Sequence, residues 1–338
     1  MKHSNIAIFV PHNGCPHTCA FCNQRVISGE QTQPTPQDVA AAAECAIRSL
    51  GENSAGSEIA FFGGSFTAIE RGYMISLLEA AAVYVRSGKI GGIRCSTRPD
   101  CIDNDVLDIL LEYGVTAIEL GAQSMDDRVL RLNERGHTAQ QVRGAAKMIK
   151  SRGIELGLQM MTGLYGDSDA GALFTARELA ALEPDTVRIY PTVVLRGTKL
   201  AELYESGEFQ PQGLDGAIPL CAKLLKFFEE RSIPIIRLGL HAGKDVEQQF
   251  VAGAYHPALR ELCESRMMLE KMLEKLNGAD KSAEYIIAVN PSDISKAVGQ
   301  KRGNMTALAG MGYKIKVVSD PQIEKGQMKI IPVCMKGV

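Results

Sequence analysis

The sequence has no tryptophan, no uninterrupted apolar run of eighteen residues and no small-residue cleavage site near its N-terminus. A membrane-spanning helix needs about 20 consecutive apolar residues, so the absence of a long apolar run argues against a membrane span. The N-terminal apolar run ends at a proline and polar residues, which predicts a first strand and not a secretory signal. At 338 residues and a net charge of -2, the chain suits one large domain with a small appendage.

Nine cysteines are scattered along the chain, an odd number that argues against a secreted disulfide framework and predicts a reducing, cytoplasmic compartment. Three of them, Cys15, Cys19 and Cys22, share the segment "CPHTCAFC". No second CxxC pair exists, so a closed zinc site would need His12 or His17 as its fourth ligand. An iron–sulfur cubane held by three cysteines keeps one iron open for a cofactor or substrate. Zinc and a chance grouping are the alternatives.

Short β-rich runs alternate with helical patterns about six times, with strands expected near residues 6, 58, 92, 117, 155, 186 and 233. This alternation predicts a parallel sheet, closed as a full or partial barrel or open and doubly wound. The polar segments obey the barrel rule that chemistry belongs at the C-terminal strand ends. The cysteines follow the first strand, "GGSF" ends the second, "STRPD" the third and "GAQS" the fourth. We therefore expect an α/β protein with a partial (β/α)6 TIM-like barrel.

The composition changes near residue 277, where "NGADKSA" has the character of a linker. From residue 281 to the end, nine Lys and Arg face four Asp and Glu, a net charge of +5 that leaves -7 for the first 280 residues. A basic module of this kind favours an anionic partner, with RNA the usual candidate and a basic surface without a partner the alternative. We expect a core barrel at 1–240, a helical extension and linker at 241–280, and a basic domain at 281–338.

The CxxxCxxC spacing on the loop after a first barrel strand resembles the signature of the radical SAM family. In that family S-adenosylmethionine binds the open iron, and one electron splits it to a 5′-deoxyadenosyl radical. The resemblance implies that Cys15, Cys19 and Cys22 hold a 4Fe–4S cluster, with an electron donor such as ferredoxin or flavodoxin. It also implies that Phe21 packs near the adenine.

The segment "FFGGSFT" resembles the family's GGE-like element, which accepts hydrogen bonds from the methionine amino group. Glycines let the backbone approach a ligand closely, which suits Gly63 and Gly64. Ser65 stands where the family has an acidic residue, so backbone carbonyls would carry that contact. A plain turn at the strand end is the structural alternative for the two glycines.

Residues 6 to 240 resemble the radical SAM domain of the catalytic subunit of Elongator, which modifies the wobble uridine of transfer RNA. The resemblance lies in "IRCSTRPDCID", "AIELGAQSMDDRVLRLNERGHT" and "RIYPTVVLRGTKLAELYESGEF". It implies cofactor contacts from Ser96, Thr97, Arg98, Gln123 and Arg188, the last replacing a lysine common in that family. It implies reactive-centre or substrate roles for Gln123, Tyr190 and Arg196, with Arg135 and His137 on the loop beyond the fourth strand. No counterpart of Elongator's acetyltransferase domain follows, and the first cysteine spacing is one residue shorter.

The basic segment at 281–338 resembles a KH domain of the NusA type, in which a loop between two helices clamps a nucleic-acid backbone. The corresponding loop is "GQKRGN", with Gly299, Lys301, Arg302 and Gly303 as the expected RNA contacts. Arg302 stands where the second glycine of GxxG belongs. A small basic cap that stiffens the barrel is the alternative.

Together these resemblances imply a radical SAM enzyme that modifies a base of RNA, most plausibly the wobble uridine of tRNA. A radical SAM oxidoreductase of a small molecule, similar to porphyrinogen oxidases, is the alternative enzyme. A non-enzymatic iron–sulfur sensor that binds RNA is the alternative outside catalysis.

Overall fold

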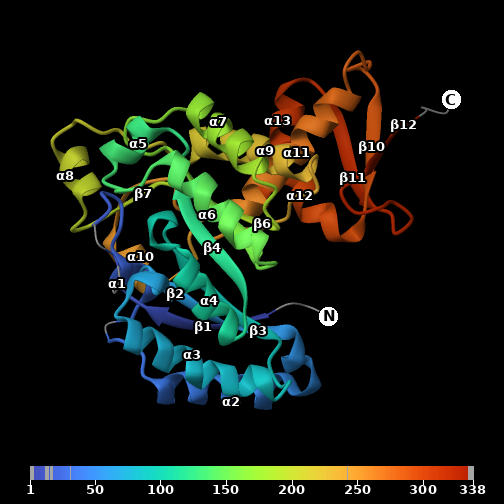
Figure 1. Ribbon diagram of the computed structural model, residues 1–338. Coiled ribbons are helices and arrows are strands. Elements are labelled where there is room, and N and C mark those ends of the chain that lie inside the picture. Colours follow the sequence, from blue (N-terminus) through green and yellow to red (C-terminus); the bar gives the residue numbers. More distant parts are fainter. Residues whose placement is uncertain (1–3, 12–14, 16–17, 31, 242, 334–338) are drawn as a thin grey trace. The chain divides into compact units, whose positions relative to one another are not determined.

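The computed structural model describes residues 4–11, 15, 18–30, 32–241 and 243–333 (Figure 1). The chain forms two compact units. The first consists of Met1–Gly213 with Phe228–Tyr255, and the second of Leu214–Phe227 with His256–Val338. Within the described residues, no helix is both long enough and apolar enough to cross a bilayer.

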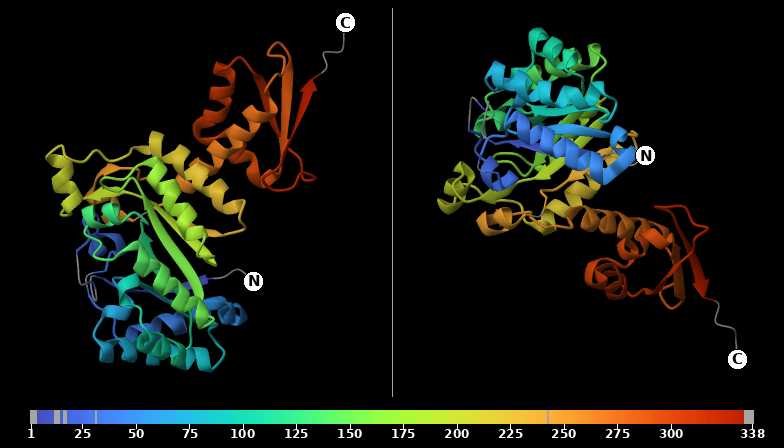
Figure 2. Two further views of the ribbon diagram at one scale, coloured as in Figure 1. Left: turned by 45° about the horizontal axis from the view of Figure 1, so that its top comes forward. Right: turned by 90° about the horizontal axis from the view of Figure 1, so that it is seen from below.

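A seven-stranded sheet forms the framework of the first unit, and every neighbouring pair of its strands is parallel. Its strands, in spatial order, are β1 Ser4–Val10, β2 Ser57–Gly63, β3 Gly92–Thr97, β4 Val115–Gln123, β5 Glu155–Thr162, β6 Thr186–Pro191 and β8 Ile235–Leu238. The strands of this sheet lie side by side in the order in which they occur along the chain, with β7 Val193–Leu195 left out between β6 and β8. The sheet is therefore singly wound, and it curls into half of a barrel (Figure 2). The expected α/β fold with a partial TIM-like barrel is confirmed, with β8 as a seventh strand.

Helices and short 3-10 turns connect these strands. Most of the longer helices contact the sheet: α2 contacts β1, α3 contacts β3, α4 and α6 contact β4, and α7 contacts β5. The first unit holds α1 Gln24–Ser28, α2 Pro36–Leu50, η1 Gly51–Gly56, η2 Phe66–Ala68, α3 Arg71–Arg86, η3 Pro99–Cys101, α4 Asn104–Glu112, α5 Asp127–Leu132, α6 Ala139–Ser151, α7 Asp169–Ala180, α8 Lys199–Glu205 and α10 Lys244–Gln249. An antiparallel pair, β7 Val193–Leu195 with β9 Phe250–Gly253, lies outside the main sheet.

Local sequence signals explain where two of these helices begin. Thr35 and Thr138 each precede a helix by one residue, and each side-chain oxygen accepts from the backbone N–H three residues later. In return, the side-chain oxygens of Asp38 and Gln141 accept from the backbone N–H of these threonines. These reciprocal capping boxes satisfy backbone N–H groups that a helix start leaves unpaired. The cap at Thr138 therefore fixes the end of the loop that carries Arg135 and His137.

A buried group of charged side chains joins four neighbouring strands. The Arg94 guanidinium on β3 donates from Nε to Glu58 Oε2 at 2.8 Å and from Nη2 to Glu155 Oε1 at 3.0 Å. Its Nη1 lies 3.5 Å from Glu119 Oε1 on β4. Arg94 is 3% exposed, so its charge depends on these carboxylates for compensation.

The second unit contains a small three-stranded sheet with the order β11–β10–β12, in which β10 is parallel to β11 and antiparallel to β12. Its elements are α11 Leu259–Lys275, β10 Glu284–Val289, η4 Pro291–Asp293, α12 Ile294–Val298, η5 Gln300–Arg302, α13 Gly303–Gly310, β11 Lys314–Ser319 and β12 Met328–Val333, together with most of α9 Leu214–Glu229. Residues 284–319 run in the order strand, helix, basic loop, helix and strand, so the basic loop lies between two helices, α12 and α13.

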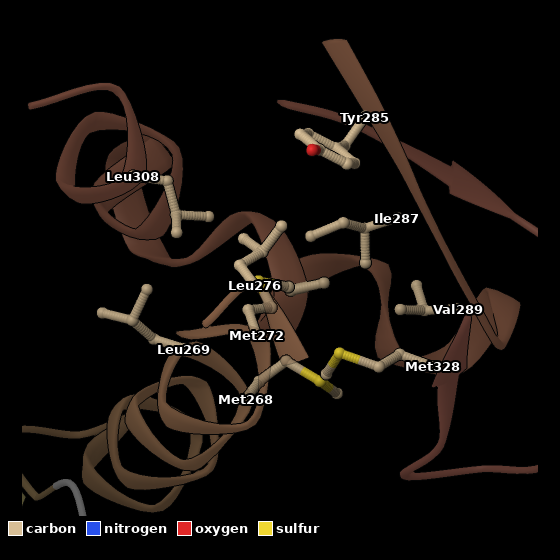
Figure 3. Close-up of a cluster of buried hydrophobic side chains, with 10 residues drawn as sticks. Met268, Leu269, Met272, Leu276, Tyr285, Ile287, Val289, Leu308 and Met328 are labelled. Atoms are coloured by element: carbon tan, nitrogen blue, oxygen red, sulfur yellow. The ribbon is translucent and has the colours of Figure 1, made fainter. Parts of the chain in front are cut away.

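Helix α11 and the small sheet share one apolar core (Figure 3). Met268, Met272 and Leu276 on the helix side pack in one cluster with Ile287 and Val289 of β10. The helix therefore belongs to the same packed body as the strands, because the side chains that bury its apolar face come from β10 and its neighbours.

Substituting Arg94 by alanine should lower the free energy of unfolding by about 3–5 kcal/mol, because it leaves buried carboxylates without a counter-charge. Lys199→Ala is the matched control, since Lys199 forms an exposed ion pair with Glu202 at 2.9 Å, and the loss of such a surface pair should leave the free energy of unfolding nearly unchanged. Urea unfolding of both variants measures the difference. Equal losses would contradict a structural role for the buried group.

Candidate active site

A cavity of about 760 Å³ opens at the C-terminal ends of the parallel strands in the first unit. Gly63 at the end of β2, Thr97 at the end of β3, Gln123 at the end of β4 and Tyr190 on β6 all line it. In a barrel of parallel strands this edge is where the following loops converge. The cavity therefore occupies the position that the sequence predicts for chemistry.

The cysteine loop forms one wall of this cavity, and Cys15, Cys19 and Cys22 all line it. Backbone bonds fix the loop from both sides: Ala20 N donates to Asn133 O at 3.1 Å, and Leu200 N donates to Ala20 O at 2.8 Å. Helix α1 begins just after Cys22, with the Asn23 side chain as its N-cap. Cys19 and Cys22 thus lie on either side of a residue pair that begins with the doubly bonded Ala20, just before α1.

The surroundings of Cys15 and Cys22 oppose the ionisation of these two thiols in the free protein. Loss of hydration, followed by the charges of the neighbouring cysteines, raises the pKa of Cys22 to about 12. Burial likewise raises the pKa of Cys15, with Cys19 as the second cause. Thiolates in such a place need a bound metal centre, because coordination displaces the thiol proton.

Within the described part of the chain, no three His, Cys, Asp or Glu side chains converge on a point that would suit a single metal ion. A cubane cluster does not require such convergence, since each cysteine binds a different iron. His12 and His17, which would complete a zinc site, lie outside the described residues. The donor set that the structure does describe fits a cluster held by three thiolates.

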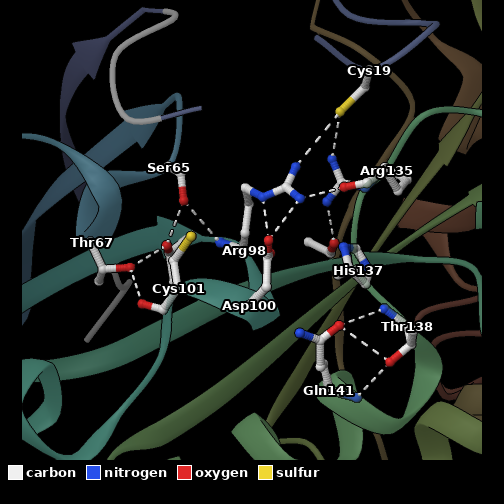
Figure 4. A network of polar contacts seen from close by, with 12 residues as sticks. Cys19, Ser65, Thr67, Arg98, Asp100, Cys101, Arg135, His137, Thr138 and Gln141 are labelled. Atoms are coloured by element: carbon white, nitrogen blue, oxygen red, sulfur yellow. Dashed lines mark hydrogen bonds and ion pairs between the residues drawn. The ribbon is translucent and has the colours of Figure 1, made fainter. Parts of the chain in front are cut away.

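Two arginines lie beside Cys19, as Figure 4 shows. Arg135 donates from Nη1 to Cys19 Sγ at 3.0 Å, and Arg98 Nη1 lies 4.0 Å from the same sulfur. Arg98 is also paired with Asp100 and donates to the backbone carbonyl of Arg135. Both arginines are buried. An anionic centre at the cysteines would compensate this positive charge, which supports the fit of an iron–sulfur cluster.

The glycines after β2 have a structural cause of their own. Gly63 has φ of +113°, and a Cβ there would meet Val10 O at 2.8 Å. Gly64 N donates to the same carbonyl at 2.8 Å. Both glycines also line the cavity. Ser65 does not: it is buried behind the wall, where its Oγ bonds to Thr97 Oγ1 at 2.9 Å and accepts from Arg98 N at 3.3 Å.

An irregularity near the end of β4 turns Gln123 toward the cavity. The register with β5 shifts between Gly121 and Gln123, so Ala122 is an inserted residue, and Gln123 has φ of +66°. Bulges of this kind redirect side chains beside active sites. The Oε1 atom of Gln123 is buried without a partner among the described residues. His137 Nε2 lies 3.2 Å from Ala122 O and supports the bulge from behind.

The opposite wall carries a second charged pair. Arg188 Nη2 donates to Glu119 Oε1 at 2.6 Å, and its guanidinium lies 4.9 Å from the centre of the Phe62 ring. Burial raises the pKa of Glu119, although Arg188 and Arg94 oppose that shift. Glu119 thereby connects the wall of the cavity to the buried Arg94 group.

The structure brings most of the predicted site residues together around one cavity. Those that line it are Cys15, Cys19, Phe21, Cys22, Gly63, Gly64, Ser96, Thr97, Arg98, Gln123, Arg188 and Tyr190. Ser65 and Arg196 do not line it; the Arg196 side chain is exposed, while its backbone N donates to Gln249 O at 2.9 Å. Sequence reasoning missed Glu119 and Gln159, whose only signal was a polar residue inside an otherwise apolar strand.

Two family models match the chain. The model of the radical SAM superfamily matches residues 9–179, and that of the radical SAM C-terminal domain matches residues 184–269. Neither match extends over 281–338, so the KH-like character of that region stays a prediction.

Among curated proteins, Elongator complex protein 3 of Homo sapiens is 31% identical over 244 residues, which is 65% of this chain and 43% of that protein. The tRNA uridine(34) acetyltransferase of Dehalococcoides mccartyi is 24% identical over 289 residues, which is 76% of this chain and 62% of that protein. The chain thus spans less than two thirds of the length of these relatives.

Among solved structures, the archaeal Methanocaldococcus infernus Elp3 with an N-terminal deletion aligns with a TM-score of 0.61 at 23% identity. The alignment covers 81% of this chain and 63% of that chain. At this level of identity the likeness concerns the fold.

Replacing His137 by glutamine should remove a pH-dependent part of the stability. Burial, followed by the nearby Arg135, lowers the pKa of His137 to about 4 from 6.5, so between these values the unfolded state binds a proton that the folded state does not. Stability then falls as the pH falls through this window, by about 2 kcal/mol between pH 7 and pH 5 for this group alone. His137→Gln keeps a donor for Ala122 O, and its unfolding free energy in urea should depend less on pH. An unchanged pH dependence would contradict the assignment.

Proposed function

The chain belongs to the radical SAM superfamily, whose enzymes use a 4Fe–4S cluster and S-adenosylmethionine, and we propose that it modifies a base of RNA, specifically the wobble uridine of tRNA. The observation that carries the proposal is the placement of Cys15, Cys19 and Cys22 on one wall of a cavity at the C-terminal strand ends. The relatives named above supply the substrate class, since one of them is a tRNA uridine(34) acetyltransferase.

In this proposal the three cysteine thiolates would hold the cluster, and the electron would come from a donor such as ferredoxin or flavodoxin. When bound, the cluster and S-adenosylmethionine supply a 5′-deoxyadenosyl radical that removes a hydrogen atom. Phe21 contributes an apolar surface beside Cys22 for the adenine.

The polar residues at the strand ends would hold the cofactor. The backbone of Gly63 and Gly64 lines the cavity without a side chain in the way, and Ser96, Thr97 and Arg98 line the next strand end. Ser65 would act from behind, through its bond to the Arg98 backbone amide. The unpaired Oε1 of Gln123 offers an acceptor for a hydroxyl or amine of a ligand.

On the opposite wall, Arg188 and Tyr190 would contact the cofactor and the substrate base respectively. Arg188 is held by Glu119 and by the Phe62 ring, so its guanidinium has a fixed orientation toward any ligand in the cavity. A flipped-out base needs a polar edge to bind and an apolar face to stack on. Tyr190 and the neighbouring Met161, which both line the cavity, provide these two kinds of surface. Arg196 lies outside the cavity and would contact RNA beyond the reacting base.

The second unit would bind the RNA backbone through the loop between α12 and α13, as in a KH domain. Lys301 and Arg302 both have left-handed backbone angles, with φ of +49° and +62°, and both are exposed. Such backbone angles are costly for residues other than glycine, and they occur often in segments that bind ligands. Gly299 begins this loop with φ of +79°, and Gly303 begins α13.

Asn304 keeps this loop in place. Its Nδ2 donates to Ser265 O and to Lys296 O, each at 3.0 Å, and it is only 6% exposed. A Cβ on Gly299 would meet the Asn304 backbone N at 2.8 Å, so the chain there needs glycine. The two basic side chains are thus presented on a rigid turn, while the nearby Lys296 is neutralised by Glu264 and Asp293.

Anaerobic incubation of the full chain with iron, sulfide, dithionite, S-adenosylmethionine and tRNA should yield 5′-deoxyadenosine and a tRNA nucleoside of changed mass. Substituting Cys15, Cys19 and Cys22 together by alanine should abolish the brown cluster absorbance and the deoxyadenosine. Cys45→Ala, at an exposed cysteine away from the cavity, is the control and should change neither. Liquid chromatography with mass spectrometry measures both products.

Different failures of this experiment have different meanings. Retained cluster absorbance in the triple variant would contradict the ligand assignment. Deoxyadenosine without any change in tRNA would favour an oxidoreductase of a small molecule. A cluster and RNA binding without deoxyadenosine would favour a sensor.

The double variant Lys301→Ala/Arg302→Ala should weaken tRNA binding and reduce the slope of log affinity against log salt by about 2, because each lost phosphate contact removes about one unit. The control is Lys89→Ala/Lys147→Ala, which removes two exposed lysines of the first unit. Fluorescence anisotropy at several salt concentrations gives both slopes. Equal slopes for the two double variants would exclude the loop as a phosphate contact.

A further inference from the structure

Arg135 is a buried cation whose charge no carboxylate among the described residues compensates. It is 6% exposed, and it has no ion pair with the Asp or Glu side chains that the structure describes. Its Nη2 donates to Gly121 O at 2.6 Å and its Nη1 to Cys19 Sγ at 3.0 Å, while its Nε is buried without a partner. An uncompensated buried charge is costly, so this guanidinium requires an anion.

Arg98 approaches the same sulfur but differs in charge balance. It donates from Nε to Asp100 Oδ1 at 2.9 Å and from Nη2 to Asp100 Oδ2 at 3.0 Å, a bidentate pair in which the two charges cancel. Its Nη1 is 4.0 Å from Cys19 Sγ, a full ångström farther than that of Arg135. Of the two arginines in Figure 4, Arg135 therefore carries the net positive charge at this sulfur.

The backbone holds Arg135 in this position independently of any ligand. Its N donates to Leu130 O at 3.0 Å, and its carbonyl accepts from Arg98 Nη2. The residues on either side, Glu134 and Gly136, both have positive φ, so the loop makes a tight turn at this point. The bond from Ala20 N to Asn133 O joins this loop to the cysteine segment, so donor and sulfur are fixed in relation to each other.

A cluster that takes up one electron gains one negative charge. A cation and an N–H donor fixed beside a ligand sulfur stabilise the reduced form more than the oxidised form. The donor needs no rearrangement when the electron arrives, because the loop already holds it. The effect reaches the cluster through Cys19 and not through contact with the substrate.

We propose that Arg135 is a positioning residue that raises the reduction potential of the cluster, by a charged N–H···S hydrogen bond to Cys19. Electron transfer from the donor then reduces the cluster more readily, with no bond formed or broken in that step. This inference rests on the proposed ligation of a 4Fe–4S cluster by the three cysteines.

The test is a redox titration of the full-length, anaerobically loaded protein, followed by the electron paramagnetic resonance signal of the reduced cluster. Arg135→Gln should disfavour reduction at least tenfold, which is about 59 mV toward more negative potential for a one-electron couple. Arg135→Lys keeps the charge but loses the planar guanidinium with its several N–H donors. The reduction potential of this variant should lie between those of wild type and Arg135→Gln.

Variants of the neighbouring pair, Arg98 and Asp100, provide matched controls, one of which should shift the reduction potential in the opposite direction. Asp100→Asn uncovers the charge of Arg98 and should raise the potential. The double variant Arg98→Gln/Asp100→Asn removes a neutral pair and should shift the potential less than Arg135→Gln does. The predicted rise in Asp100→Asn also tests the charge effect if Arg135→Gln fails to fold.

Each other outcome has a distinct meaning. A wild-type protein that holds no iron–sulfur cluster would overturn the proposed function and, with it, this inference. A loaded Arg135→Gln protein with the wild-type potential would overturn the inference and leave the proposed function standing. Weaker binding of S-adenosylmethionine at an unchanged potential would show that Arg135 binds the cofactor instead, which also overturns it.

Discussion

All strands of the main sheet run in the same direction, and the rest of the structure depends on this constraint. Parallel strands place their C-terminal ends at one edge, so segments separated by more than a hundred residues meet around one cavity. The cysteine loop after β1, the glycines after β2 and the bulge at the end of β4 thereby become walls of the same space. The site consists of strand ends, and the sheet supplies its rigidity.

The buried charged side chains of the first unit form two groups, which differ in the ratio of arginines to carboxylates. In the first group, Arg94 pairs with the carboxylates of Glu58, Glu119 and Glu155. Glu119 also binds Arg188, which lines the cavity. Among the described residues, the group beside Cys19 has two arginines but one carboxylate, that of Asp100. In the first group three carboxylates face two arginines, so each arginine has a counter-charge from the protein itself. The second leaves a positive charge where the proposed cluster would bring a negative one, which connects the electrostatics of the fold to its chemistry.

In the second unit the proposed binding residues lie on an exposed backbone turn and not in a cavity. Lys301 and Arg302 occupy conformations that glycine adopts more easily, and the buried Asn304 holds the turn on which they lie. A helical extension, α11, shares its core with the small sheet and with α13. The proposed RNA contact is therefore carried by a packed body, in which side-chain charge replaces the close backbone approach that two glycines would allow.

The sequence by itself determined the fold class, the cysteine trio and the strand ends on which polar residues would gather, because these depend on local periodicity and short spacings. Most of the residues that the family resemblance singled out for the site do line the cavity. Only the tertiary structure decided that Ser65 lies behind the wall, that Arg196 lies outside it and that Glu119 belongs to it. Likewise, only the fold brought Arg135 to Cys19, 116 residues away in the chain. No local pattern encodes that pair, since its geometry depends on how β4 and the loop after it pack against the cysteine segment.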